Sequence, residues 1–275
     1  MTSPPLPQEL IDKIIDQFGD TDRLSSSRTR NKNDLASLSM VSKAWKERSQ
    51  KHLFSVFDLQ KLSSAYITEA QLDGLELVFS LTKDLEIDGL WEVHSQFDPM
   101  AISSLRCFRN LETLSLSGWH FQWAGPKQLS TCFGHLGETL IHLKLDGTAN
   151  SDLLIYLTSM FPRLYVLEIS IPGLRDEARR ISTEDLPTTG SFQGYLHLWG
   201  LSKTHNDFLA FLSSTSPRFD SICADNCDAG DGLGKLLNST AASLESLELY
   251  IEEDRPQGEF LNLEANFDID SLLLS

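Results

Sequence analysis

Two stretches of similar pattern, Leu140-Ile141-His142-Leu143-Lys144-Leu145 and Leu164-Tyr165-Val166-Leu167-Glu168-Ile169, decide the fold of this chain. Each has apolar residues at its first, fourth and sixth positions, and the middle residues, Leu143 and Leu167, are 24 positions apart. Apolar residues that alternate with polar ones over a few positions are typical of a β-strand with one buried face. A short strand that returns at a regular interval predicts a repeat architecture with a parallel sheet.

The same frame recurs along the 275 residues, at successive spacings of 24 to 29 residues. This period lies within the range of about 20–29 residues that is typical of leucine-rich repeats, and the copies resemble that family. The asparagine or cysteine that the family places three residues after the last strand leucine is present only as Cys227. The resemblance implies a parallel, curved sheet of short strands. The middle residues of the expected strands are Phe57, Leu85, Leu114, Leu143, Leu167, Leu196, Ile222, Leu247 and Leu272.

Segments with helical spacing lie between several of the expected strands. They run from Asp152 to Phe161, from Asp207 to Leu212 and from Leu233 to Leu237. We expect these segments to form the layer on the convex side of the sheet. The segment from Gly173 to Gly190 is the least repeat-like, and we expect it to be a projecting loop.

Side chains alternate along each strand, so one set points into the core and the other points to the concave face. On that face we find an acidic strand at 84–88 and an aromatic group that acids surround on neighbouring strands. Exposed aromatic rings beside carboxylates would suit a peptide that carries apolar and basic residues. The candidate substrate-binding residues are Glu86, Asp88, Lys144, Asp146, Glu168, Tyr195, His197, Trp199, Asp225, Glu248 and Tyr250.

Two alternatives stay open for these side chains. Tyr195 and Trp199 could instead pack under the expected loop at 173–190. The run of acidic residues after Tyr250 fits a solvated face better than a binding patch, because charge runs often only solvate or repel.

The stretch from Leu6 to Phe54 does not follow the repeat. After Pro7, the residues Leu10, Ile11, Ile14, Ile15 and Phe18 share one face of an expected short helix. A polar loop is expected at 19–33. Asp34 then caps a second expected helix, on which Leu35, Leu38, Val41 and Trp45 fall at helical spacing.

The order of residues in this stretch is Leu6-Pro7-x-Glu9-Leu10, then Leu38-x-x-Val41-Ser42-Lys43-x-Trp45, then His52-Leu53-Phe54. It resembles the F-box, in particular the N-terminal F-box of short fungal proteins, over roughly the first fifth of the chain. The insert at 19–33 is longer than the turn usual in that family. The resemblance implies docking on the Skp-type adaptor of a cullin-based ubiquitin ligase. The positions that match F-box residues which pack the module or touch the adaptor are Leu6, Pro7, Glu9, Ile14, Leu38, Val41 and Trp45.

Periodicity alone leaves another interpretation open for the same helices. They could be a small helical hairpin that only caps a larger domain. Ile14, Val41 and Trp45 would then be internal core.

The fold class expected is α/β, with a small helical F-box-like module at residues 1–54 and a leucine-rich-repeat-like solenoid at residues 55–275. The insert at 19–33 is expected to be flexible. Phe54 closes the first pattern and opens the first strand frame, so the two parts are expected to share a core. The ninth frame is followed only by Ser275, which suggests either a chain cut short or an exposed last edge.

The charge is divided unevenly along the chain. Residues 1–61 hold ten Lys and Arg against eight Asp and Glu, and the remainder holds 13 against 31, which gives +2 and −18 and a net charge of −16. So acidic a surface repels phosphate backbones, and nucleic acid is not an expected partner. A neutral or basic protein partner is easier to accommodate.

Four scattered cysteines, and no apolar run of 18 residues, indicate a reducing compartment and no membrane segment. We expect the cytoplasm, the nucleus or both.

The sequence contains no recognisable catalytic motif. Cys223-x-x-x-Cys227 lacks a second pair of zinc ligands at suitable spacing, and Cys227 sits at a repeat turn. Gly230-Asp-Gly232-Leu-Gly234-Lys235 lacks the first glycine and the Ser or Thr of a phosphate loop, so we interpret it as a repeat turn. We expect no enzyme activity, no metal and no cofactor.

The function expected from the resemblance is the substrate-recognition subunit of a Skp-cullin-F-box ubiquitin ligase, which recruits a protein target for degradation through the concave face. The alternative is a leucine-rich-repeat-like scaffold that binds a protein partner without a role in ubiquitin transfer.

Overall fold

The computed structural model describes residues 7–19, 33–58, 78–88, 106–120, 126–149, 151–171, 191–227 and 230–250. These residues form an α/β structure with a parallel sheet and several helices, which is compatible with a repeat-like α/β fold. The chain divides into two compact units, one of Met1–Ser117 with Thr131–Leu140 and one of Gly118–Ser130 with Ile141–Ser275. The predicted division into residues 1–54 and 55–275 stays a prediction.

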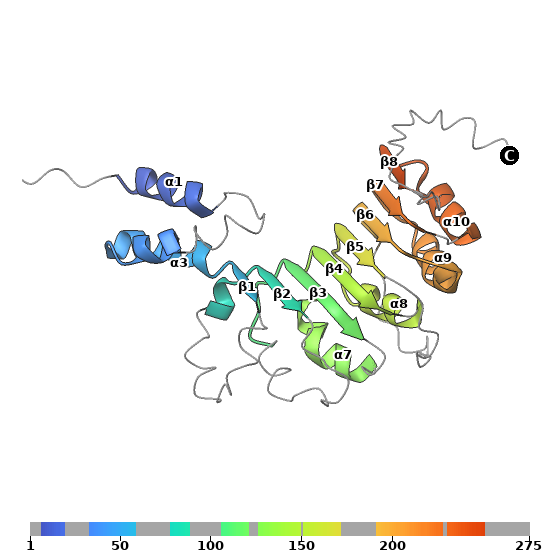
Figure 1. Cartoon of the computed structure of the whole chain (residues 1–275), viewed down its shortest axis with the longest axis horizontal. Coiled ribbons are helices and arrows are strands. Elements are labelled where there is room, and N and C mark those ends of the chain that lie inside the picture. The colour runs from blue at the N-terminus through green and yellow to red at the C-terminus, as the bar shows by residue number, and fades with distance from the viewer. Residues whose placement is uncertain are drawn as a thin grey trace, which may run out of the picture. The chain divides into compact units, whose positions relative to one another are not determined.

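The first unit begins with a small group of helices. Helix α1 (Gln8–Gly19) lies beside helix α3 (Lys43–Leu53), and a further helical turn spans residues 33–39 (Figure 1). The apolar face predicted for α1 is confirmed at Ile11 and Ile15, which are buried together with Leu35. The partly buried side chains that pack against this core are Leu38, Trp45 and Leu53.

The second predicted helix is in fact interrupted. The helical residues 33–39 end in a turn at Met40 and Val41, and α3 begins only at Lys43. Ser42 has an extended backbone (φ −162°, ψ 171°) at the N-cap of α3, a position that serine favours. Asp34 was expected to cap this helix, but it lies within the helical residues 33–39. Val41 therefore leaves the helical face on which its spacing placed it.

Three parallel strands follow: β1 (Val56–Asp58), β2 (Asp84–Asp88) and β3 (Thr113–His120), of which β3 belongs to the first unit as far as Ser117. The predicted middle residues Phe57, Leu85 and Leu114 lie side by side in the register of these strands. The buried rings of Phe79 and Phe108, which lie before β2 and β3, are 4.6 Å apart between centroids. The strand prediction is confirmed here.

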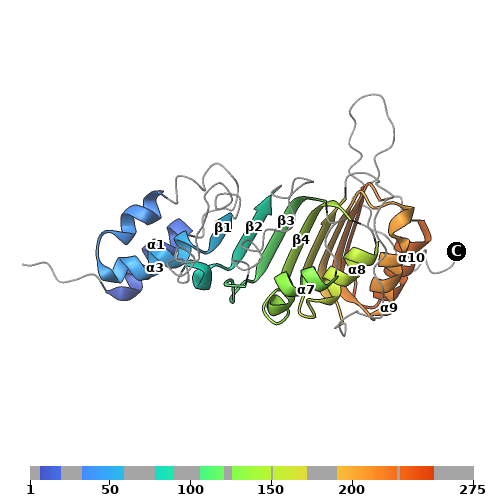
Figure 2. The same ribbon diagram turned by 90° about the horizontal axis from the view of Figure 1, so that it is seen from below.

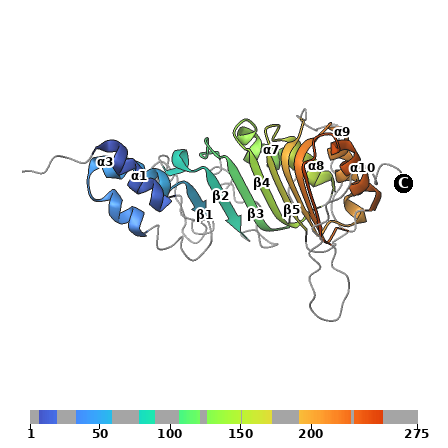
Figure 3. The same ribbon diagram turned by 90° about the horizontal axis from the view of Figure 1, so that it is seen from above.

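Five parallel strands form the sheet of the second unit in chain order (Figures 1 and 3). Their predicted middle residues again form one row across the sheet, in the order Leu143, Leu167, Leu196, Ile222 and Leu247. The predicted strand around Leu196 is therefore in phase with its neighbours. The strands are β4 (His142–Thr148), β5 (Val166–Ser170), β6 (Gln193–Trp199), β7 (Arg218–Asp225) and β8 (Ser246–Tyr250).

The same backbone contact recurs where strands begin. The carbonyl oxygen of Ile141 accepts hydrogen bonds from the N–H groups of Tyr165 and Val166, at 2.8 and 2.9 Å. In the first unit, the carbonyl of Lys83 accepts from Glu112 and Thr113 in the same way, also at 2.8 and 2.9 Å. Backbone hydrogen bonds of the same form therefore recur along with the repeat found in the sequence.

Three helices lie along one face of the strands β4 to β8 (Figure 2): α8 (Ser151–Ser159), α9 (Asn206–Ser214) and α10 (Gly230–Thr240). All three predicted helical segments are confirmed. Each helix buries apolar side chains, among them Leu154, Phe208 and Leu236. The short 3-10 helix η4 (Lys203–His205) precedes α9, and its buried His205 contacts the carbonyl of Ala149 at 3.2 Å.

Two elements differ from the sequence-based expectation. The helix α7 (Pro126–Phe133) and the 3-10 helix η2 (Gly134–Leu136) were not predicted. The glycine-rich segment from Gly230 was predicted to be a turn, but it forms the start of α10. A Cβ atom at Gly232 would lie 2.5 Å from Oδ1 of Asn206, so the glycine permits the close approach of α10 to α9.

The side chain of Tyr165, the residue just before β5, reaches across β6 to β7. The hydroxyl of Tyr165 donates to Oδ2 of Asp220 in β7 at 3.1 Å. Between them lies Gly194 in β6, where a Cβ atom would approach the Tyr165 carbonyl oxygen to 2.4 Å. Asp220 is itself the extra residue of a β-bulge, because Gly194 pairs with Phe219 and Tyr195 pairs with Ser221.

Several predictions concern residues outside the described ranges. These are the loop at 19–33 except its two ends, the projecting loop at 173–190, the ninth strand around Leu272 and the acidic run after Tyr250. Within the part of the chain that the structure describes, no helix has the length and apolar character needed to cross a membrane.

The contact at Gly194 yields a stability prediction. Its φ of +84° disfavours any side chain, and an added methyl group would collide with Tyr165. We expect Gly194→Ala to lower the free energy of unfolding by more than about 1 kcal/mol. Gly234 in α10 is the matched control, because a Cβ atom there meets nothing within 4 Å. Gly234→Ala should raise stability by about 0.5–1 kcal/mol, and urea unfolding of both variants measures the difference. Equal stability of the two variants would contradict this account of β6.

Candidate binding surfaces

The residues predicted to bind the adaptor lie in different environments on the N-terminal helices. Pro7 and Glu9 are exposed at the start of α1, and Ile14 is half-buried. Leu38 and Trp45 pack against the buried core. Of the other two predicted residues, Val41 is exposed and Leu6 lies outside the described residues.

Three large apolar side chains of this region are open to solvent. Met40 is 86 % exposed, Val41 61 % and Leu10 48 %. Met40 and Val41 occupy the turn before α3, where their N–H groups donate to the carbonyls of Ser37 and Leu38, both at 3.1 Å. The hydrogen-bonded turn therefore presents two adjacent apolar side chains to water. Leu10 was predicted to lie on the buried face of α1, so its exposure is a correction.

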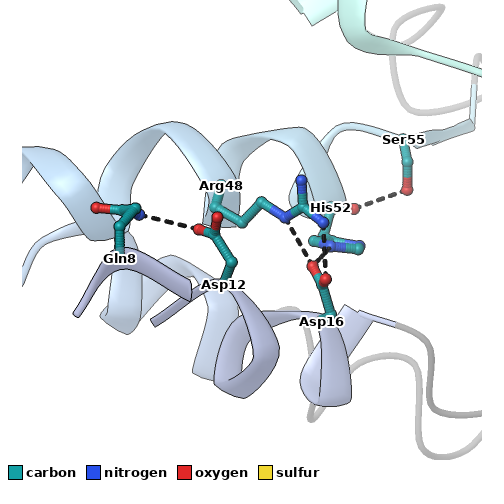
Figure 4. A network of polar contacts seen from close by, with 6 residues as sticks. All are labelled: Gln8, Asp12, Asp16, Arg48, His52 and Ser55. Carbon is teal, nitrogen blue, oxygen red and sulfur yellow. Dashed lines mark hydrogen bonds and ion pairs between the residues drawn. The ribbon is translucent and has the colours of Figure 1, made fainter. Parts of the chain in front are cut away.

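A polar network joins α1 to α3 (Figure 4). The guanidinium of Arg48 donates two hydrogen bonds to the carboxylate of Asp16, both at 2.7 Å. Nε2 of His52 lies 2.7 Å from Oδ1 of the same carboxylate. Two parallel Arg–carboxylate bonds fix both the distance and the orientation of the groups they join. The network therefore holds the two helices in one arrangement at the end opposite to Pro7.

The network changes the acidity of Asp16. Hydrogen bonds from Arg48, and after them from His52, lower the pKa of Asp16 to about 2. The pKa of an aspartate in an unfolded chain is about 3.9. Because the folded pKa is the lower one, Asp16 stabilises the fold fully above about pH 4, and this contribution is lost as the pH falls toward 2.

This shift leads to a prediction about pH and stability. We expect Asp16→Asn to lower the urea midpoint at pH 7, because Arg48 and His52 lose their common acceptor. The difference from the wild-type chain should shrink between about pH 4 and pH 2. Asp12→Asn is the control, since Asp12 is on the same helix and accepts only the exposed side-chain bond from Gln8. A wild-type advantage that persists unchanged at pH 2 would contradict the assigned role of Asp16.

The second surface is the side of the strands β4 to β8 that α8, α9 and α10 do not cover, which we call the β4–β8 face. The predicted alternation is confirmed along β5 and β6, where buried residues such as Leu167 and Leu196 alternate with less buried ones. Along β8 the difference is smaller, because Leu247 and Leu249 are only half-buried.

The register of the strands arranges the β4–β8 face in straight rows. One row runs through Lys144, Glu168, His197, Cys223 and Glu248 on successive strands. A parallel row, two residues further along each strand, contains Asp146, Ser170, Trp199, Asp225 and Tyr250. These two rows contain the predicted substrate-binding residues of the second unit except Tyr195, which lies two residues before His197 on β6, in register with Val166 and Ser221.

One part of this face has its charges paired. Oε1 of Glu168 lies 2.9 Å from Nε2 of His142, and Oε2 lies 3.2 Å from Nζ of Lys144. The hydrogen bond from His142 is the largest cause of a low pKa of Glu168, which is about 2. Next to this group, Ser170 donates to Asp146 at 3.1 Å. On the β4–β5 part of the face, the carboxylates of Glu168 and Asp146 therefore have partners within the protein.

Tyr195 and Cys223 occupy the middle of the face. The rings of Tyr195 and His197 are 6.3 Å apart between centroids. Cys223 lies in a row of outward-facing positions between His197 and Glu248, but its side chain is buried. Burial raises the pKa of the Cys223 thiol, and the nearby Glu248 and Asp225 raise it further. Such a thiol is inert at neutral pH, because the reactive form is the thiolate.

The β8 edge of the face carries an exposed aromatic side chain. Tyr250 is 42 % exposed, and its hydroxyl donates to Oε2 of Glu248 at 3.1 Å. Asp225 lies between Trp199 and Tyr250 in the register of β6, β7 and β8. An acidic residue therefore lies between two aromatic residues at this edge.

The remaining two predicted substrate-binding residues belong to the other unit. Glu86 lies on β2 and is half-buried, and Asp88 ends the same strand. They are neighbours of β1 and β3, with Glu86 in register with Ser115. We describe them separately from the β4–β8 face.

Sequence reasoning missed several interacting residues. His142 was on the expected face but was not selected, although it contacts Glu168. The clamp of Asp16, Arg48 and His52 was also missed, because a carboxylate and its partners more than 30 positions apart leave no local pattern. Its only signal was that Arg48 and His52 are four residues apart, on one face of a helix.

The described residues contain no group of three or more His, Cys, Asp or Glu side chains arranged to hold a metal ion. The Sγ atom of Cys227 lies 3.4 Å from the carbonyl oxygen of Asp225 and 3.5 Å from that of Leu198. Its surroundings are thus backbone carbonyls and not a set of metal ligands.

Comparison with protein-family models and with curated proteins finds no match to this chain.

Proposed function

We propose that this chain is a non-catalytic substrate receptor of a Skp-cullin-F-box ubiquitin ligase. In this proposal the N-terminal F-box-like helices bind the Skp-type adaptor. The β4–β8 face of a leucine-rich-repeat-like domain binds a protein target. The observation that carries the proposal is the exposure of Met40 and Val41, at the place where the sequence resembles the F-box.

Within the described part of the N-terminal helices, several apolar side chains are not buried. The buried hydrophobic core there consists of Ile11, Ile15 and Leu35, and a module this small gains much from burial against a partner. An adjacent pair of exposed apolar side chains, with Leu10 exposed on α1, is what such a partner would cover. Among the predicted adaptor residues, Val41 is therefore proposed as a contact, and Leu38 and Trp45 as internal core.

In such a ligase the chain itself performs no chemistry. It holds a lysine of the target near a conjugating enzyme, so that an intermolecular transfer becomes effectively intramolecular. In this proposal the chain is located in the cytoplasm or the nucleus and uses no cofactor.

The competing function is a repeat scaffold that binds a protein without any role in ubiquitin transfer. The observation that favours it is the packing of Leu38 and Trp45 into the core, which an N-terminal cap would also need. The two proposals differ in whether the chain binds the adaptor at all.

Calorimetric titration of the full chain with a purified Skp-type adaptor tests the proposal. We expect binding, and we expect Val41→Asp to weaken it at least about tenfold, because a carboxylate would replace an apolar contact. Ile141→Asp is the matched control, since Ile141 is also an exposed apolar residue but lies in the other unit. It should leave adaptor binding unchanged. Failure of the wild-type chain to bind, or equal binding by Val41→Asp, overturns the ligase proposal.

A further inference from the structure

The two parts of the β4–β8 face differ in how their charges are satisfied. On β4 and β5, Glu168 has the imidazole of His142 and the ammonium of Lys144 as partners. On β7 and β8, the carboxylates of Asp225 and Glu248 form no ion pair with a Lys or Arg among the residues that the structure describes. The second part therefore holds two negative charges that a ligand could neutralise.

The same part of the face holds aromatic side chains in a defined order. Trp199, Asp225 and Tyr250 are direct neighbours on the successive strands β6, β7 and β8. Adjacent strands are about 4.8 Å apart, so the Cα atoms of Trp199 and Tyr250 are separated by roughly 10 Å, with the carboxylate between them. Glu248 lies close to this row, since it accepts the hydrogen bond of Tyr250 at 3.1 Å.

A guanidinium group fits this arrangement better than other side chains do. It is planar and weakly hydrated, it stacks on aromatic rings, and it donates paired hydrogen bonds to a carboxylate. An ammonium group offers the charge without the plane or the fork of donors. The phosphates of a nucleic acid would be repelled by the two carboxylates.

We propose that the β6–β8 part of this face binds an arginine side chain of the protein target, with Trp199 and Tyr250 beside the guanidinium and Asp225 as its main acceptor. This inference rests on the proposed function, because it assigns the chemistry of the target to the same face. It also divides the predicted substrate-binding residues. Lys144 and Glu168 support the sheet, and the residues on β6 to β8 contact the ligand.

Fluorescence anisotropy of the full chain with short labelled peptides tests this assignment. The probe is a heptapeptide of two arginines, two leucines and three glycines, and its counterparts carry lysine or glutamate in place of arginine. We expect the arginine peptide to bind most tightly, the lysine peptide more weakly and the glutamate peptide not at all. Because the contact is electrostatic in part, binding of the arginine peptide should weaken as salt is raised.

Variants of the face locate the site. Asp225→Asn and Trp199→Ala should each weaken binding of the arginine peptide at least about tenfold. Tyr250→Phe should keep most of the affinity, because it retains the ring and loses only the bond to Glu248. Asp231→Asn is the matched control, because Asp231 is exposed on α10, on the other side of the strands, and it should change affinity less than about twofold. Asp225→Asn hardly changes the size of the side chain, and circular dichroism verifies that each variant is folded.

Equal binding of the arginine and glutamate peptides contradicts the proposal, and so does full affinity in folded Asp225→Asn. An equal affinity for the lysine peptide would contradict the choice of a guanidinium. Adaptor binding by the same protein samples is measured separately. A chain that binds the adaptor but not the arginine peptide refutes only this inference, and one that binds the peptide but not the adaptor refutes the ligase proposal.

Discussion

The burial of two apolar side chains on each of β4, β5 and β6, on the side that the helices cover, determines which residues these strands present on the opposite side. Leu143 and Leu145, Leu167 and Ile169, and Leu196 and Leu198 are all buried. Because side chains alternate along a strand, a shift of one residue would move these groups to the opposite face. Their burial thereby aligns the polar and aromatic residues between them in rows. The arrangement of side chains on the β4–β8 face follows from the requirements of the core.

This constraint explains how much of the fold could be predicted. The apolar frame identified every strand position that the structure describes, and the rows of the β4–β8 face follow from it directly. The buried phenylalanines Phe79, Phe108, Phe133 and Phe161 recur at a similar interval and strengthen the period, but they lie outside the frame and were overlooked. The curvature of the sheet and the leucine-rich-repeat assignment stay predictions.

The remaining differences arise where spacing in the sequence carries no information about neighbours in space. Helical spacing in the sequence continues through Val41, but in the structure a new helix begins after its N-cap Ser42, and Val41 is exposed in the turn before it. The glycines from Gly230 suggested a turn, whereas close contact with Asn206 makes Gly232 suitable inside a helix. Cys223 lies on the expected face but is buried. At Gly232, a contact with another helix decided the outcome.

The central claim is that one chain links an adaptor to a target through two separate surfaces. Analytical ultracentrifugation of the chain mixed with a Skp-type adaptor and the labelled arginine peptide tests this most directly, with absorbance followed at the wavelength of the label. The account predicts that the peptide sediments with the adaptor when the chain is present, and only then. It also predicts that Val41→Asp removes the adaptor from the peptide-bound species while Asp225→Asn removes the peptide from the adaptor-bound one. Displacement of the peptide by the adaptor, or loss of both ligands in either variant, would contradict it.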